Sequence, residues 1–263
     1  MGWCPNGRRQ PRPVRPVAWW TLPVLAALGA GLAGPGPAAS GAELLRFETA
    51  AGTLDVYPVG HGSLYVLFGG LVIHVDPYSR VADYSALPKA DQIWITHSHP
   101  DHLDLAAIQA VEKDTTIFVT DATSATRLGS RRVVVLRNGE TTEQQGVSIE
   151  AVPAYNLVQE RAPGQKYHPR GEGNGYVATF GGFRVYIAGD TECIPEMGRL
   201  GRVDVAFLPI NLPFTMPPEE AVGCIKVIAP RTVVPYHQGD SDPAVVARAL
   251  QNSGIEVLVF RLP

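Results

Sequence analysis

The 263-residue chain has little cysteine. Only three cysteines are present. Cys4 lies near the start, which leaves Cys193 and Cys224 in the main part of the chain. Two cysteines do not make the disulfide framework that holds small secreted folds together. They could pair in an oxidising compartment, but each is more typical of a small buried side chain. The composition therefore excludes a disulfide-dense scaffold.

Charge is also sparse. Charged residues make up 18% of the chain and the formal net charge is −3. No basic stripe stands out after the first 42 residues, so nucleic acid is not an expected partner. Low-complexity segments and short-period repeats are likewise missing from that part of the sequence. With 45% hydrophobic residues, the composition suits one large globular domain.

The start of the chain differs from the rest. Four arginines lie between residues 8 and 15, an apolar run follows over 17–30, and small residues come next. This order is typical of a secretory signal peptide. We predict a cleaved leader over 1–42 and an exported, periplasmic or extracellular domain over 43–263, with no membrane partner beyond the leader. The alternative of an uncleaved anchor is disfavoured, because Pro23 keeps the apolar run short.

Short apolar runs punctuated by glycine and proline fill the rest of the chain. The runs that predict strands are 44–49, 53–59, 63–68, 71–75, 92–96, 117–120, 133–136, 147–153, 176–180, 183–188, 203–208, 233–236 and 255–262. Helices are expected over 103–113, 122–128, 217–230 and 242–252. Strands followed by helix–strand alternation, twice over, predict an α/β (α+β) fold, a four-layer αββα sandwich. The remaining segment, 155–174, is a long polar loop, and such loops are usually functional or mobile.

The most informative segment reads THSHPDHLD from residue 96. It holds three of the seven histidines and directly follows an apolar run. Alternate spacing points His97 and His99 the same way on extended backbone, and Asp101 and His102 follow where the chain turns into a helix. Imidazole nitrogens and carboxylate oxygens are ligands of zinc and similar divalent ions. The segment therefore indicates a metal site.

Three further polar residues lie just past the ends of apolar runs. They are Asp76, Asp190 and His237. Together with the histidine segment, four runs thus end in residue types that bind metals, a pattern that chance rarely supplies.

The H-x-H-x-D-H signature and these later residues resemble the metallo-β-lactamase superfamily over nearly the whole chain after the leader. The resemblance implies the αββα fold, with the polar residues gathered at one sheet edge. By position it implies a first ion bound by His97 and His99, a second ion bound by Asp101, His102 and His237, and Asp190 between the two. The implied cofactor is a pair of Zn²⁺ ions, although nitrogen and oxygen ligands also serve Mn and Fe.

The activity that the resemblance implies is metal-dependent hydrolysis. Two ions lower the pKa of a shared water, and the resulting hydroxide attacks the carbonyl or phosphoryl centre of a small ester, lactone or phosphodiester. Asp101 and His102 are the residues assigned to catalysis. Two alternatives stay open on the same fold: a metal-binding protein without turnover, with a sensor or assembly role, and a diiron redox enzyme.

One ligand departs from the superfamily pattern. Many members carry a histidine after the strand that corresponds to 147–153, whereas this chain reads Pro-Ala-Tyr-Asn there. The arrangement P-A-Y-N … H-P … G-x-G-Y is similar to that of the ascorbate-phosphate lactonase group. This likeness implies that His168 reaches the first ion from the loop 155–174. The alternative is a surface histidine and a weak first site.

Several polar residues are expected around the ligands or the substrate. Asp76 could accept the second N–H of a ligand imidazole, or it could simply form the turn before proline. His61 precedes a strand and is expected near the metal, with a plain turn residue as the alternative. Tyr155, Asn156 and Tyr236 are assigned to the same surroundings.

Other polar residues have simpler expected roles. Asp104 is expected to cap the helix that follows it, and His74 to be structural within its strand. Arg161, Lys166 and Arg170 on the long loop could hold a phosphate or a carboxylate, but solubility is the simpler explanation.

Overall fold

The computed structural model describes Met1, residues 44–260 and Leu262. Apart from Met1, the predicted leader, 1–42, lies outside the described residues. A search of the described residues for a helix that is long and apolar enough to cross a membrane finds none.

A seven-stranded sheet is formed by the first half of the domain. Its strands follow chain order: β1 (Leu45–Thr49), β2 (Gly52–Gly60), β3 (Ser63–Phe68), β4 (Leu71–Val75), β5 (Gln92–Trp94), β6 (Ile117–Thr120) and β7 (Arg132–Val135). The first four strands pair antiparallel, and β4 to β7 pair parallel.

A second seven-stranded sheet is formed by the second half. Its order is β16 (Glu256–Val257), β15 (Thr232–Tyr236), β14 (Val205–Pro209), β13 (Phe183–Ile187), β12 (Gly175–Phe180), β9 (Val147–Val152) and β8 (Thr141–Gln144). Strands β13 to β16 pair parallel, so this sheet also has a parallel half and an antiparallel half.

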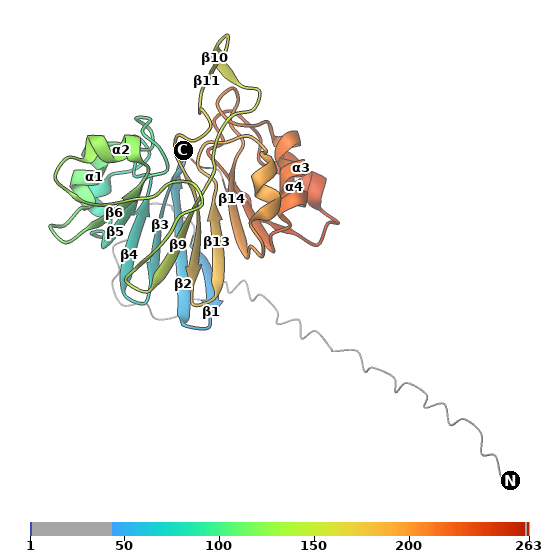
Figure 1. The fold of residues 1–263 in the computed structure, drawn as a ribbon, viewed down its shortest axis with the longest axis horizontal. Helices are drawn as coiled ribbons and strands as arrows, with labels where there is room; N and C mark the ends of the chain where they lie inside the picture. Colours follow the sequence, from blue (N-terminus) through green and yellow to red (C-terminus); the bar gives the residue numbers. More distant parts are fainter. Residues whose placement is uncertain (2–43, 261, 263) are drawn as a thin grey trace. The chain divides into compact units, whose positions relative to one another are not determined.

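Helices cover the outer faces of the sheets (Figure 1). On the first sheet lie α1 (Leu105–Val111) and α2 (Ala122–Leu128), whose apolar side chains join Ile93 and Phe118. On the second lie α3 (Pro218–Ile228) and α4 (Ala244–Leu250). Two short 3₁₀ helices are η1 (Tyr84–Ala86) and η2 (Pro195–Arg199). The predicted αββα sandwich is confirmed.

The main core lies between the two sheets. In β5, Trp94 points into this core, whereas Ile93 points toward the helices on the outer face. Successive side chains of a strand point to opposite faces, and both faces are covered here. This burial on both sides explains why the central strands read as continuous apolar runs.

The predicted elements differ from the observed ones mainly where the sequence is polar. Strand β8 has the sequence TTEQ and was not predicted; it lies at a sheet edge and pairs only with β9, where one face needs no apolar residues. The loop 155–174 contains a hairpin of β10 (Glu160–Ala162) and β11 (Gln165–Lys166). Among the described residues of the last predicted strand, 255–262, only β16 forms.

Candidate metal centre

The structure brings the predicted ligands together at the carboxyl ends of the parallel strands. From the first sheet, Asp76 follows β4 and the segment 97–102 follows β5; from the second, Asp190 follows β13 and His237 follows β15. His168 reaches the same place from the loop 155–174. Side chains far apart in sequence therefore meet at one edge of the sandwich.

Three imidazoles form a first group: His97, His99 and His168. The Nε2 atom of His97 lies 3.0 Å from Nδ1 of His99, and that atom lies 3.2 Å from Nε2 of His168. Ligand atoms about 2.0–2.2 Å from one zinc ion are roughly 3–3.5 Å from each other. The three nitrogens therefore have the spacing of donors around a single ion.

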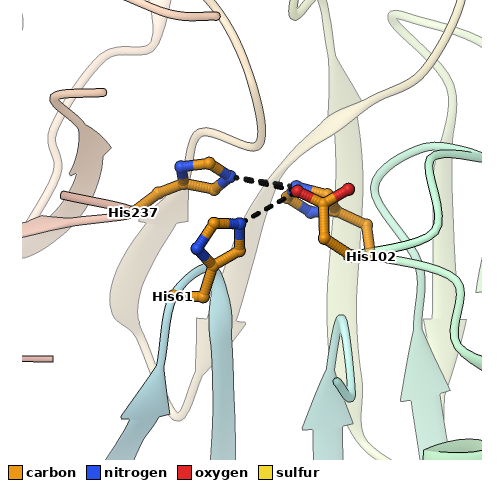
Figure 2. A group of neighbouring side chains, drawn as sticks. His61, His102 and His237 are labelled. Atoms are coloured by element: carbon orange, nitrogen blue, oxygen red, sulfur yellow. Dashed lines mark hydrogen bonds and ion pairs between the residues drawn. The ribbon is translucent and has the colours of Figure 1, made fainter. Parts of the chain in front are cut away.

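Three imidazoles and a carboxylate form a second group: His61, Asp101, His102 and His237. Figure 2 shows His61, His102 and His237 converging from separate elements. The Nε2 atoms of His102 and His237 are 3.3 Å apart, and each lies 3.7 Å from Oδ2 of Asp101. His61, which the sequence predicts near the metal, lies inside this group.

Asp190 lies between the two groups and is 4% exposed. Its Oδ1 lies 3.4 Å from Nε2 of both His102 and His237, while its Oδ2 lies 3.4 Å from Nε2 of His168. Within the described part of the chain, Oδ1 is a buried oxygen with no hydrogen-bond partner. A buried carboxylate oxygen without a partner is costly, and a cation would satisfy it.

Neighbouring side chains fix which imidazole nitrogen faces the cluster. The Nδ1 atom of His102 lies 2.8 Å from Oδ2 of Asp76, and the same oxygen accepts a hydrogen bond from the Thr96 hydroxyl. The Nδ1 atom of His168 lies 2.9 Å from Oδ1 of Asn156. Each of these Nδ1–H groups donates to an oxygen acceptor, so in the neutral imidazole each Nε2 presents a lone pair to the cluster, which is the tautomer that metal binding through Nε2 requires.

In the second sheet, hydrogen bonds position the backbone before Asp190 and the ring of His237. The hydroxyl of Tyr236 accepts a hydrogen bond from the backbone N–H of Gly189, directly before Asp190, at 2.9 Å. The amide of Asn211, which follows β14, lies 3.3 Å from Nδ1 of His237. Asn211 was not predicted, because no local motif marks it.

Burial and charge set the protonation of the cluster. Burial is the main cause that lowers the pKa of His97 well below 6.5, and it lowers the pKa of His168 to about 4. Burial acts in the same direction on His102, but Asp190, Asp76 and Asp101 outweigh it and raise the pKa of that imidazole. Burial raises the pKa of Asp190, yet the surrounding imidazoles hold it well below 3.8.

A buried carboxylate anchors the loop that carries His168. Glu192, 1% exposed, accepts hydrogen bonds from the backbone N–H groups of residues 157, 158 and 159 at 2.6–3.0 Å, and from the Asn156 side chain at 3.2 Å. Glu192 was missed in the sequence, because the N–H groups that donate to it come from a segment more than thirty residues earlier. The contacts of Tyr155 also support the loop, since its hydroxyl donates to Glu196 at 3.0 Å.

A pocket of about 90 Å³ opens beside the first group. His97, His99 and His168 line one side, and Arg161, Lys166 and Tyr167 from the β10–β11 hairpin and its flank line another. The ammonium of Lys166 is paired with Glu160 at 3.0 Å, whereas no ion pair of Arg161 is found within the described residues. Thr123 and the carboxylates Asp121 and Glu172 also line the pocket.

The donor set fits a pair of divalent cations. Nitrogen and oxygen donors in two groups, the oriented lone pairs of His102 and His168, and the unpartnered oxygen of Asp190 all face inward. Cys193 and Cys224 are free thiols, and neither belongs to either group. Imidazole and carboxylate donors suit zinc, manganese and iron.

Comparison with known proteins finds a matching family model and similar sequences and folds. Residues 55–237 match the family model described as "Beta-lactamase superfamily domain". A UPF0173 metal-dependent hydrolase of Methanopyrus kandleri is 30% identical over 223 residues, which is 78% of this chain and 94% of the relative. One from Thermus thermophilus is 32% identical over 199 residues, covering 72% of this chain and 86% of the relative.

A solved structure is closer in sequence. A Parabacteroides distasonis protein, assigned provisionally as a metal-dependent hydrolase, is 45% identical, superposes with a TM-score of 0.80, and is matched over 84% of this chain and 100% of its own. A metallo hydrolase of Ignicoccus hospitalis is 24% identical with a TM-score of 0.67, over 84% of this chain and 96% of its own, and shows the shared fold.

Proposed function

From the premise that this chain belongs to the β-lactamase superfamily, as a metal-dependent hydrolase with the metallo-β-lactamase fold, we propose that it works with two divalent ions, most suitably zinc. His97, His99 and His168 would hold one ion. Asp101, His102 and His237 would hold the other, and Asp190 would contribute to both sites.

The observation that carries this proposal is the position of Asp190. Its two oxygens face different groups, at 3.4 Å from imidazole nitrogens on both sides, and Oδ1 has no hydrogen bond within the described part of the chain. A single ion in one group would need only one of these two oxygens. Two ions, one in each group, would need both.

The chain's own residues supply binding and orientation. Asp76 and Asn156 keep the Nε2 lone pairs of His102 and His168 directed inward. Asp101 adds a carboxylate that is 31% exposed, at the rim of the second group. When bound, a pair of divalent ions lowers the pKa of a water molecule and polarises the substrate's oxygen.

We propose esters, lactones and phosphodiesters of small molecules as the substrate class. The pocket beside the first group admits a small polar substituent and has Arg161 and Tyr167 on its wall. The fold itself does not select among these substrates, so the residues of the β10–β11 hairpin are the ones expected to set the choice.

We also propose that the protein is exported. The support is the order of arginines, apolar run and small residues within 1–42. Amino-terminal sequencing of the protein purified from cells tests this: a chain that starts near residue 43 supports export, and a chain that starts at Met1 contradicts it.

The activity is tested with the metal-loaded protein and two variants, His99→Ala and Asp190→Asn. Hydrolysis of ester, lactone and phosphodiester panels is measured together with bound metal. We expect two metal equivalents in the unaltered protein, and a fall in kcat/KM of at least about a hundredfold in each variant. Asp240→Asn, an exposed aspartate three residues past His237, is the matched control. Unchanged rates in His99→Ala with an intact fold would contradict the proposal, and bound metal without turnover on any panel would favour a binding role.

A further inference from the structure

We propose that His61 is a direct ligand of the second ion, so that the two ions are held unequally. The second ion then has five protein donors, from His61, Asp101, His102, His237 and Asp190. The first has four, from the first group and Asp190, and it faces the pocket. This inference rests on the proposed dinuclear centre.

The first observation is the position of the His61 ring. Its Nε2 lies 2.9 Å from Oδ2 of Asp101, and its ring centroid is 3.8 Å from that of His237 (Figure 2). One donor atom each from His61, Asp101, His102 and His237 lie within 4.8 Å of one another. The distance to Asp101 is about the separation of adjacent donors around one ion.

The second observation is that the turn carrying His61 is built against this group. His61 has a φ of +49°, a left-handed conformation that non-glycine residues rarely adopt. Its carbonyl accepts the backbone N–H of His237 at 2.9 Å. The turn between β2 and β3 is thereby tied to the residue after β15, in the other sheet. Backbone conformations of this kind persist only where the surroundings impose them.

The next residue in the turn supports the same conclusion. A Cβ atom at Gly62 would lie 2.9 Å from Cε1 of His102 and 3.3 Å from Cδ2 of His237. Only glycine lets the backbone approach both rings this closely. The turn therefore places His61 directly on the second group, and the close approach leaves no room for a side chain at residue 62.

The unequal donor sets assign different roles to the two ions. Catalytic zinc sites keep a position for water or substrate and can expand to five ligands, so a site with four protein donors can still accept one more ligand, whereas a site with five is full. The pocket is lined by His97, His99 and His168 and by no member of the second group. We therefore assign the open position, and the substrate's oxygen, to the first ion, and tight retention to the second.

The competing explanation is that His61 only donates a hydrogen bond to Asp101. The variant His61→Gln distinguishes the ligand role from the hydrogen-bonding role, because a glutamine amide can still donate to Asp101 but is a poor ligand for zinc or cobalt. His61→Asn is a second variant, since asparagine tolerates the left-handed backbone better. His74→Gln is the matched control: His74 is buried in β4 and belongs to neither group.

The experiment measures metal affinity and Co²⁺ absorption in the full protein. Zinc is titrated by competition with a chelator, and cobalt is added to the metal-free protein; circular dichroism of each metal-free variant checks the fold. We expect His61→Gln and His61→Asn to weaken the tighter of two zinc sites by at least about a hundredfold, and to change the cobalt spectrum of that site. His74→Gln should leave both unchanged.

The outcomes separate this inference from the proposed function. If His61→Gln keeps the affinities and cobalt spectrum of the unaltered protein, His61 is not a ligand, although the dinuclear centre stands. If the unaltered protein binds only one metal equivalent, the dinuclear proposal fails. In that case, an unchanged affinity of the single site in His61→Gln also overturns the ligand role of His61, whereas a hundredfold weaker affinity supports that role. Should His61→Gln misfold, His61→Asn carries the same test, and unaltered binding in that variant would overturn the ligand role.

Discussion

At the scale of single residues, the site depends on side chains that hold the ligands rather than on the ligands alone. Asp76 and Asn156 each accept an N–H from an imidazole and so direct its other nitrogen into the cluster. Such supporting contacts commonly change metal affinity or activity by about 10- to 100-fold.

Asp76→Asn should therefore weaken binding of the second ion. The amide keeps the shape of the carboxylate but removes its charge and can turn an N–H toward His102, which would favour the wrong tautomer. We expect zinc affinity and kcat/KM to fall by about 10- to 100-fold, measured by chelator competition and steady-state kinetics. Asp104→Asn is the control, because Asp104 caps α1 by accepting from the N–H of Ala106 and asparagine also caps helices well. Equal losses in both variants would contradict the assigned role of Asp76.

His74 gives a second residue-scale prediction, which concerns stability against pH. Burial lowers the pKa of His74 to about 4, while its Nε2–H donates to the carbonyl of Pro88. The folded state keeps this imidazole neutral, whereas the unfolded state binds a proton below about pH 6.5. The unfolded state thus gains protons first as the pH falls, and the folded state loses stability between pH 6.5 and 4.

His74→Leu should remove this part of the pH dependence. The difference in free energy of unfolding between the variant and the unaltered protein should change by up to about 3 kcal/mol between pH 7.5 and pH 4. Urea denaturation at both pH values measures it, and the metal ligands, common to both proteins, largely cancel. A difference that stays constant with pH would show that His74 is not held neutral.

At the scale of elements, strand ends could be predicted and loop supports could not. His97, Asp190 and His237 each follow an apolar run, and runs of this kind are visible in the sequence alone. Asn211 also follows a strand, but an asparagine there carries no metal-binding signal. Glu192 is beyond such reasoning altogether, because its partners are backbone N–H groups of a segment without regular structure. The position of His168 came from resemblance, and its supporting contact with Asn156 from the structure.

Glu192→Ala should release the start of the loop 155–174. Three backbone N–H groups would lose their acceptor, at a cost of about 1–3 kcal/mol for each group that stays buried. We expect faster proteolysis within 157–168 and weaker binding of the first ion, with the second ion unaffected. Limited proteolysis and zinc titration measure this. Gln165→Ala, at an exposed residue of the same loop that does not line the pocket, is the control; a loop as resistant as before would contradict the anchoring role.

At the scale of the whole molecule, the centre joins the two sheets. The first sheet supplies the segment 97–102, the second supplies Asp190 and His237, and the turn at His61 is hydrogen-bonded to His237. In the proposed centre, bound ions would connect the two sheets, which otherwise contact each other through the apolar core. Binding to the folded state alone stabilises it by mass action, by about 4 kcal/mol at a ligand concentration a thousand times Kd.

Removal of metal should accordingly lower the melting temperature. For a domain of this size, 4 kcal/mol corresponds to roughly 10 °C. Calorimetry of the protein with zinc and after chelation should show this shift, and Asp190→Asn should show a much smaller one. The same melting temperature in both states would mean that the ions do not join the sheets.

The central claim is that two ions lie between residues drawn from both sheets, and X-ray diffraction from zinc-loaded crystals tests it most directly. Anomalous difference density should show two peaks: one within about 2.3 Å of the nitrogens of His97, His99 and His168, and one equally close to Nε2 of His102 and His237, each touched by one oxygen of Asp190. A single peak, or peaks beyond coordinating distance of Asp190, would contradict it.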